Sequence, residues 1–194
     1  MRFEDIERLV EDVFEKYEKY ANVKYDGEEI TLLEHSLQIA KLAEEHGASE
    51  EVILGAFFHD IGHVLEVEQS HMPEENWKYI VGKHNETGHQ FLIENNFPHS
   101  IASPAKYHVN AKRYLVCRVK EYHDGLSECS KRTLIGQGGP MSEKEAREFE
   151  QLPYFQTAVN VRKWDDKAKV IGQTTPTLEK YKSMCLDYLV QIMK

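Results

Sequence analysis

Apolar residues recur at helical spacing along most of the chain. Between residues 2 and 20, charged residues surround an apolar set that repeats every three or four positions, namely Phe3, Ile6, Leu9, Val10, Val13, Phe14 and Tyr17. This spacing predicts an amphipathic helix with a single apolar stripe. A second amphipathic helix is predicted from Thr177 to Met193. No segment alternates apolar and polar residues long enough to indicate a strand, so we predict an all-α fold.

Helix-capping signals divide the rest of the chain. Thr31-Leu32-Leu33-Glu34 is a capping box, which predicts a helix that runs to about His46 and stops at Gly47. Ser142-Glu143-Lys144-Glu145 is a second box, opening a helix to about Gln151. The remaining predicted helices run from Ser49 to about Leu65, from His84 to about Asn95, from Pro98 to about His108, onward from Asn110, from Ser127 to Ile135, and from Leu152 to about Lys169, with Asp165 near the middle of the last. Residues 21–30 and 66–83 are predicted to be irregular.

A chain of 194 residues with 41% apolar residues can bury a core of its own. We therefore expect one domain over 1–194, made of an N-terminal helix (1–20), a loop (21–30) that caps the site, a core (31–170) and a C-terminal helix (176–193). No apolar run approaches the roughly 20 residues of a membrane span. A net charge of −9 disfavours nucleic acid and anionic membranes as partners.

The chain ends and cysteines indicate a compartment. The first residues, Met1-Arg2-Phe3-Glu4-Asp5, are too acidic for a signal peptide. The three cysteines are scattered and contain no CxxC pair. Reduced thiols are typical of such a set, so we expect a cytoplasmic protein.

The apolar stretch over residues 55–63 carries two histidines and a carboxylate. Residues four apart share one helix face, so His59 and His63 are predicted to lie together, with Asp60 beside them. Burying these groups without partners costs several kcal/mol each. A metal ion resolves this cost, because imidazole and carboxylate are common ligands. The alternative is a solvated face with a chance His-Asp pair.

Further candidate ligands lie on other predicted helices. His35, His59-Asp60 and the distant Asp165 form the H…HD…D pattern of the HD-domain superfamily and can hold one metal ion. If Asp60 bridges, His84 and His108 complete a second metal position, and a dinuclear site would be buried in a helical bundle. The other histidines are expected at the surface or around the site; they are His46, His71, His89, His99 and His123.

Several short segments extend this resemblance. They are Tyr25-Asp26-Gly27-Glu28, residues 33–38, residues 59–63, Ala111-Lys112-Arg113-Tyr114-Leu115, Gln137-Gly138-Gly139-Pro140-Met141-Ser142 and residues 162–169. Together they resemble the phosphonate-cleaving HD-domain diiron oxygenases over about residues 20–170. The segments at 111–115 and 137–142 separate this family from generic HD phosphohydrolases.

The resemblance implies roles for individual residues. Two iron ions, as an Fe(II)/Fe(III) pair, would be held by His35, His59, Asp60, His84, His108 and Asp165. The positions that match phosphonate contacts are His63, Lys112, Ser130, Thr133 and Gln137, with Arg162 in a supporting position. Tyr25 would cap an open iron position, and Glu28 would receive a substrate ammonium. Without the resemblance, Lys112 reads as a solvated helix residue, Ser130 and Thr133 as helix-surface residues, and Tyr25 with Glu28 as a surface loop.

The resemblance also implies a reaction. We expect O2-dependent cleavage of the C–P bond of a 1-hydroxyalkylphosphonate, with (1R)-2-amino-1-hydroxyethylphosphonate as substrate and glycine and phosphate as products. The partners would be the organophosphonate and O2, acting on a monomer or small homo-oligomer. A metal-dependent phosphohydrolase of the HD class is the alternative, and a metal-binding regulatory module is a third reading.

Overall fold

A computed structural model describes residues 2–24, 28–70 and 83–193. Within these ranges the regular structure is helical, apart from one isolated antiparallel bridge between Lys24 and Thr31. The helices are α1 (Phe3–Lys19), α2 (Leu32–Glu45), α3 (Glu50–Phe58), α4 (Ile61–Ser70), α5 (His84–Glu94), α6 (His99–Arg118), α7 (Glu128–Gly136), α8 (Glu143–Glu150), α9 (Phe155–Asp165) and α10 (Leu178–Ile192). The predicted all-α class is confirmed, and one domain over 1–194 stays a prediction.

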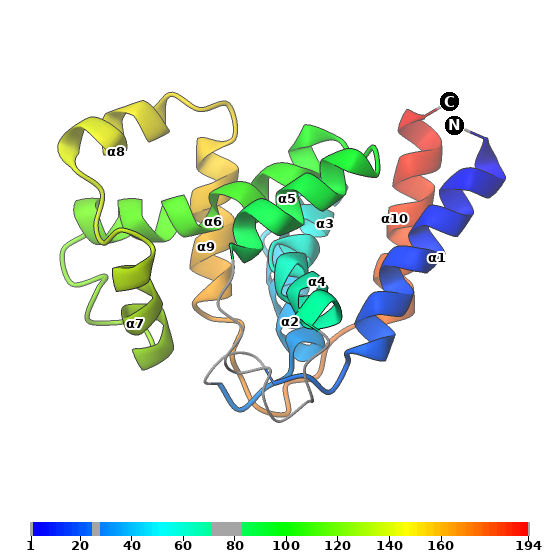
Figure 1. The fold of residues 1–194 in the computed structure, drawn as a ribbon, viewed down its shortest axis with the longest axis horizontal. Coiled ribbons are helices and arrows are strands. Elements are labelled where there is room, and N and C mark those ends of the chain that lie inside the picture. The colour runs from blue at the N-terminus through cyan, green and yellow to red at the C-terminus, as the bar shows by residue number, and fades with distance from the viewer. Residues whose placement is uncertain (1, 25–27, 71–82, 194) are drawn as a thin grey trace.

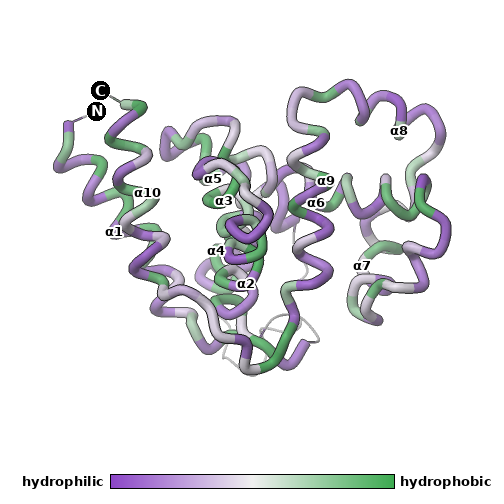
Figure 2. The backbone as a smooth tube through the Cα atoms, turned by 180° about the vertical axis from the view of Figure 1, so that it is seen from behind, coloured by the Kyte–Doolittle hydropathy of each residue, from purple (hydrophilic) through white to green (hydrophobic). Residues whose placement is uncertain are grey.

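The terminal helices pack beside each other at one end of the molecule (Figure 1). Hydrophilic and hydrophobic residues alternate along both, as the amphipathic pattern predicted (Figure 2). Their apolar faces meet α3 through aromatic rings: Phe14 stacks on Phe57 with ring centroids 5.4 Å apart, and Tyr181 lies 5.6 Å from the same ring. This larger core buries residues 53–58 of α3, the part of the helix that leads to His59.

A smaller core lies at the opposite end, between α6, α8 and α9 (Figure 1). It is built from buried residues such as Leu115, Phe149 and Val159. Helices α6 and α9 contribute to both cores. Because these two helices run between the cores, their middle and terminal residues can face the centre of the molecule.

Both predicted capping boxes are present. The Thr31 hydroxyl accepts a hydrogen bond from the Glu34 amide at 3.1 Å, and the Glu34 carboxylate accepts one from the Thr31 amide at 2.7 Å. Ser142 and Glu145 make the same reciprocal pair at the start of α8. Gly47 has φ +69°, the left-handed conformation that ends α2. None of the helices in the described ranges is long and apolar enough to cross a membrane.

The predicted helix over 49–65 is wrong as a single element. Helix α3 ends at Phe58 and α4 begins at Ile61, with His59 and Asp60 in the turn between them. The turn lets α4 pack against α5 at Gly62, where an added Cβ would lie 1.8 Å from the His84 carbonyl oxygen. His59 and His63 therefore do not share one helix face, and α4 continues to Ser70 through part of the segment predicted to be irregular.

Two other predicted boundaries are also wrong. The break between His108 and Asn110 does not exist, because α6 runs unbroken through both residues and also accommodates Pro104. Asp165 is the last residue of α9, where the prediction placed it near the middle. Beyond the helix the backbone bonds to α2: the Ala168 carbonyl accepts from His35, and Gln38 pairs with the backbone of residue 170.

Candidate active site

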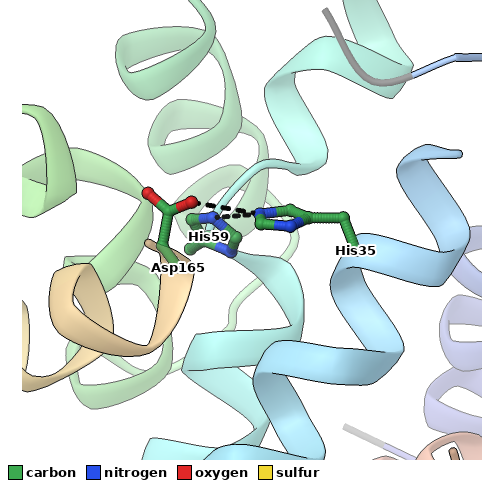
Figure 3. Close-up of side chains that lie close together, drawn as sticks. All are labelled: His35, His59 and Asp165. Atoms are coloured by element: carbon green, nitrogen blue, oxygen red, sulfur yellow. Dashed lines mark hydrogen bonds and ion pairs between the residues drawn. The ribbon is translucent and has the colours of Figure 1, made fainter. Parts of the chain in front are cut away.

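Three separate elements bring His35, His59 and Asp165 together (Figure 3). His35 lies in the first turn of α2, His59 in the turn after α3, and Asp165 at the end of α9. The His35 Nε2 atom lies 3.4 Å from His59 Nε2 and 3.3 Å from Asp165 Oδ1. All three residues are at most 1% exposed. We call this group the inner half of the site.

Asp60 connects the inner half to a second pair of histidines. Its Oδ2 atom lies 3.2 Å from His59 Nε2 and 3.7 Å from His35 Nε2. Its Oδ1 atom lies 3.3 Å from His108 Nε2 and 3.7 Å from His84 Nε2. The two histidine Nε2 atoms of this pair are 3.0 Å apart. We call His84 and His108 the outer half; the carboxylate of Asp60 presents one oxygen to each half.

Backbone carbonyls determine which ring nitrogen carries the proton. The Nδ1 atoms of His35, His59 and His108 lie 2.8, 2.8 and 2.9 Å from the carbonyl oxygens of Ala168, Ala56 and Ala105. A carbonyl only accepts, so each Nδ1 donates, and each neutral ring presents a lone pair at Nε2. These lone pairs point toward one another and toward carboxylate oxygens, an arrangement that is repulsive without a cation and suited to holding one.

The pKa shifts of the site residues differ in direction. Burial would lower the pKa of His59, but the neighbouring Asp60 carboxylate raises it. Burial, with a further contribution from His63, holds the pKa of His84 well below its usual range. Burial lowers the pKa of His108 to about 4, although Asp60 opposes the shift. Burial alone would raise the pKa of Asp60, but the imidazoles of His59 and His108 hold it well below its usual range. Neutral imidazole and ionised carboxylate are the forms that bind metal.

Asp165 supplies a further test of the fit. Its Oδ1 atom is buried and accepts no hydrogen bond from the described residues, while Oδ2 is ion-paired with Arg162. A buried carboxylate oxygen left in this state costs free energy unless a cation lies nearby. The residues present therefore fit a metal centre, with Asp60 positioned between two groups of candidate ligands.

His63 lies at the edge of the outer half. Its ring stacks on His84 with centroids 3.9 Å apart, and its Nδ1 lies 3.8 Å from Glu66 Oε2. With Asp60 and His84 it forms a group whose candidate ligand atoms all lie within 4.8 Å of one another. Its side chain is 27% exposed, against 13% for His84. His63 is thus brought to the site from α4, by the turn after α3, on the side nearer solvent.

A polar cradle lies between α6 and α7. The Lys112 side chain is buried one turn beyond His108, and its Nζ donates to Thr133 Oγ1 at 2.9 Å and to the Ser130 carbonyl at 3.5 Å. Burial, reinforced by the nearby Arg162 charge, lowers the pKa of Lys112 to about 8. The structure therefore brings together three of the predicted phosphonate contacts and rules out a solvated position for Lys112.

Two further predicted contact residues lie at the end of α7 and in α9. Gln137 caps the end of α7, and its Oε1 atom is buried and accepts no hydrogen bond from the residues the structure describes. Arg162 donates to Ser130 Oγ at 3.4 Å and forms ion pairs with Asp165 and Asp166. Arg162 thus lies between the cradle and the inner half.

The predicted capping residues are described only in part. Tyr25 lies outside the described residues, as does His71. Glu28 is described: its Oε1 atom lies 3.1 Å from Lys169 Nζ, and its side chain is 19% exposed. Lys169 follows Ala168, whose carbonyl bonds to His35, so Glu28 is tied to a segment that supports the inner half.

Sequence reasoning missed Tyr122, Asp166 and Lys169. Tyr122 and Asp166 contact the Arg162 guanidinium, and Lys169 pairs with Glu28. Asp166 and Lys169 lie in the segment 162–169 that carried the resemblance, whereas Tyr122 carried no signal in the sequence. The remaining described histidines belong to neither half: His46, His99 and His123 are exposed, and His89 is partly exposed.

The HD-domain model matches residues 32–149. This span contains His35, His59, Asp60, His84 and His108. The chain belongs to the HD-domain family. The match ends before Arg162 and Asp165, which the fold nevertheless brings to the same centre.

Three curated relatives are similar over most of their lengths. A hydroxymethylphosphonate dioxygenase of Gimesia maris is 40% identical over 92% of this chain and 89% of its own. A 1-hydroxy-2-(trimethylamino)ethylphosphonate dioxygenase (glycine-betaine-forming) of Leisingera caerulea is 39% identical over 87% and 84%. An uncharacterized protein of Acanthamoeba polyphaga mimivirus is 37% identical over 96% and 84%. Within the HD domains, the chain therefore belongs to the group of phosphonate-cleaving oxygenases, as the motifs predicted.

Proposed function

We propose that this protein uses O2 to cleave the C–P bond of a 1-hydroxyalkylphosphonate at a diiron centre. The position of Asp60 carries the proposal, because one buried carboxylate presents an oxygen to each of two histidine groups. A single-metal site needs only one of these groups. The phosphonate substrates in the relatives' names support the same chemistry.

We assign the ligands by halves. His35, His59 and Asp165 would hold one iron, His84 and His108 would hold the other, and Asp60 would contribute to both. When bound, the iron pair supplies redox chemistry with O2 and positive charge for a phosphonate dianion. Six protein ligands leave coordination positions open for substrate.

The cradle binds and orients the phosphonate. Lys112 contributes a charge-assisted donor, and its burial removes the water that would weaken this interaction. The hydroxyls of Ser130 and Thr133 and the amide of Gln137 add donors, and His63 approaches from the outer half. This arrangement places the negative charge of the substrate between Lys112 and the metal centre, within a protein whose net charge is −9.

We assign (1R)-2-amino-1-hydroxyethylphosphonate as the substrate, with glycine and phosphate as products. The atoms of the two products equal those of the substrate plus one O2, so no other oxidant is needed. Glu28 is the proposed partner of the substrate ammonium, and Tyr25 the proposed cap of an open iron position. Glu28 Oε1 already pairs with an ammonium group, that of Lys169 at 3.1 Å, and this contact supports the proposed role.

Phosphorus NMR of the iron-loaded protein with racemic 2-amino-1-hydroxyethylphosphonate tests the proposal. We expect phosphate under O2, from at most half of the racemate, with an equal amount of glycine in the proton NMR spectrum, and no phosphate under argon. If the protein consumes hydroxymethylphosphonate but not the aminated compound, the proposed reaction stands and the proposed substrate is wrong.

The alternative is an HD-class phosphohydrolase acting on a nucleotide or phosphate monoester. Its support is the inner half with Asp60, which alone would suffice for a hydrolytic metal site. Oxygen dependence separates the two functions, because hydrolysis needs only water and a redox-inactive metal. Phosphate release from a monoester at the same rate under argon and air would favour the hydrolase.

A further inference from the structure

The side chain of Arg162 determines how Asp165 faces the inner half. Arg162 is 4% exposed, and its Nη1 group forms an ion pair with Asp165 Oδ2. This contact occupies one carboxylate oxygen and leaves Oδ1 directed toward His35, 3.3 Å from its Nε2 atom. The orientation of the candidate ligand therefore depends on where the guanidinium is held.

Two residues without an assigned role hold that guanidinium from its other side. Arg162 Nη2 forms an ion pair with Asp166 Oδ1, and Arg162 Nε donates to the Tyr122 hydroxyl at 3.3 Å. The Tyr122 hydroxyl in turn donates to Asp166 Oδ2. The three side chains close a ring of hydrogen bonds, in which each fixes the other two.

A turn in the backbone before Tyr122 brings its side chain to this contact. Helix α6 ends at Arg118, and the chain turns through Glu121, a non-glycine residue with φ +70°. Such a conformation is uncommon and costs free energy that surrounding contacts must offset. The turn carries Tyr122 back over the end of α9, 44 residues away from Asp166 in sequence.

We propose that Tyr122 and Asp166 are positioning residues for the metal centre: they hold Arg162 so that Asp165 keeps Oδ1 directed toward the inner half, where it would serve as a ligand. The inference rests on the proposed metal assignment, and neither residue contacts the outer half. Outer partners of metal ligands typically change metal affinity by about 10–100-fold when removed. Loss of the Tyr122 hydroxyl should therefore weaken one of the two iron positions selectively.

Tyr122→Phe tests this proposal by metal binding, independently of turnover. Anaerobic equilibrium dialysis against Fe(II) gives the affinity and the number of irons per chain. We expect the dissociation constant of one of the two irons, that of the inner half, to rise about tenfold. Tyr114→Phe is the matched control, because it also removes a tyrosine hydroxyl donated to a carboxylate, that of Glu150 at 3.0 Å in the smaller core.

Variants that lack one ligand histidine identify which iron position is affected. With His108→Ala, only the inner iron remains, and adding Tyr122→Phe should weaken it about tenfold. With His35→Ala, the outer position remains, and adding Tyr122→Phe should leave its affinity unchanged. Equal weakening in both backgrounds, or none in either, overturns the inference.

A second variant and a folding measurement complete the test. Asp166→Asn keeps an acceptor for Arg162 but removes the charge, so we expect weakening at the same position by a smaller factor. Circular dichroism melting of each variant separates lost positioning from lost folding. If the wild-type chain binds fewer than two irons, the proposed diiron centre fails; if it binds two and Tyr122→Phe is unchanged, only the present inference fails.

Discussion

The inner and outer halves of the site differ in how their side chains are supported. In the inner half, His35 and His59 are fully buried, each Nδ1 is bonded to a carbonyl, and Asp165 is held by Arg162. In the outer half, His84 is the first residue of α5 and is 13% exposed. Every residue of the inner half is buried and held by its neighbours, whereas the outer half combines one such residue, His108, with the partly exposed His84.

This difference indicates that the two halves have different roles. The exposed edge of the outer half carries His63, and the cradle with Lys112 begins one turn from His108. We therefore expect substrate to approach through the outer half, while the inner half retains its iron throughout. Asp60 belongs to both halves, so substitutions that separate it from its neighbours give the strongest tests.

The largest effect is expected for Asp60→Ala. Because this carboxylate contacts both halves, we expect loss of both irons and at least about a thousandfold loss of activity. His108→Ala should remove mainly the outer iron. Metal counting per chain checks both variants. Retention of one tightly bound iron by Asp60→Ala would show that Asp60 does not bridge.

Gly62→Ala should disturb the outer half alone. The new Cβ would lie 1.8 Å from the His84 carbonyl oxygen, so α4 and α5 must move apart. We expect about 1–3 kcal/mol of destabilisation, with loss of the outer iron and retention of the inner one. Thermal melting and metal counting measure the two effects. Gly136→Ala is the matched control, because no atom lies within 4 Å of its added Cβ.

The cradle is predicted to lose substrate affinity in alkali. Burial lowers the pKa of Lys112 from 10.5 to about 8, so the folded protein holds the charged ammonium below that pH and loses it above. We expect kcat/KM for hydroxymethylphosphonate, which carries no amine of its own, to fall about tenfold for each pH unit above that value. Lys112→Arg should remove this decrease of kcat/KM at alkaline pH, since arginine stays charged. If kcat/KM of that variant still falls above the same pH, the decrease is due to the titration of another group.

The smallest effect is expected at the partly exposed Glu28. Glu28→Gln keeps the size of the side chain but removes its charge. We expect kcat/KM for the aminated substrate to fall by about tenfold or less, because solvent screens a partly exposed pair. The value for hydroxymethylphosphonate should stay within about twofold. Equal losses on both substrates would remove Glu28 from substrate selection.

Local signals in the sequence predicted much of the fold. Both capping boxes, the amphipathic terminal helices and the stop at Gly47 are confirmed, because each depends on residues close together in the chain. The turn at His59-Asp60 was not predicted. It depends on the contact of Gly62 with His84, which lies in another helix and leaves no local pattern.

The sequence by itself determined the kinds of side chain available to the site and their family. His35, His59, Asp60, His84, His108 and Asp165 could all be named as candidate ligands, because imidazole and carboxylate stand out in apolar helices. The grouping of Lys112 with Thr133 followed from resemblance alone, and the contact between them is visible only in the structure.

Only the tertiary structure decided how these groups face one another. It gave Asp60 one oxygen toward each half, set the histidine tautomers through backbone carbonyls, and placed Tyr122 behind Arg162. Every residue has a backbone carbonyl, so the sequence does not indicate which carbonyl will accept the hydrogen bond from His35. The orientation of a ligand depends on contacts between segments more than a hundred residues apart, such as Ala168 with His35, and packing alone brings such segments together.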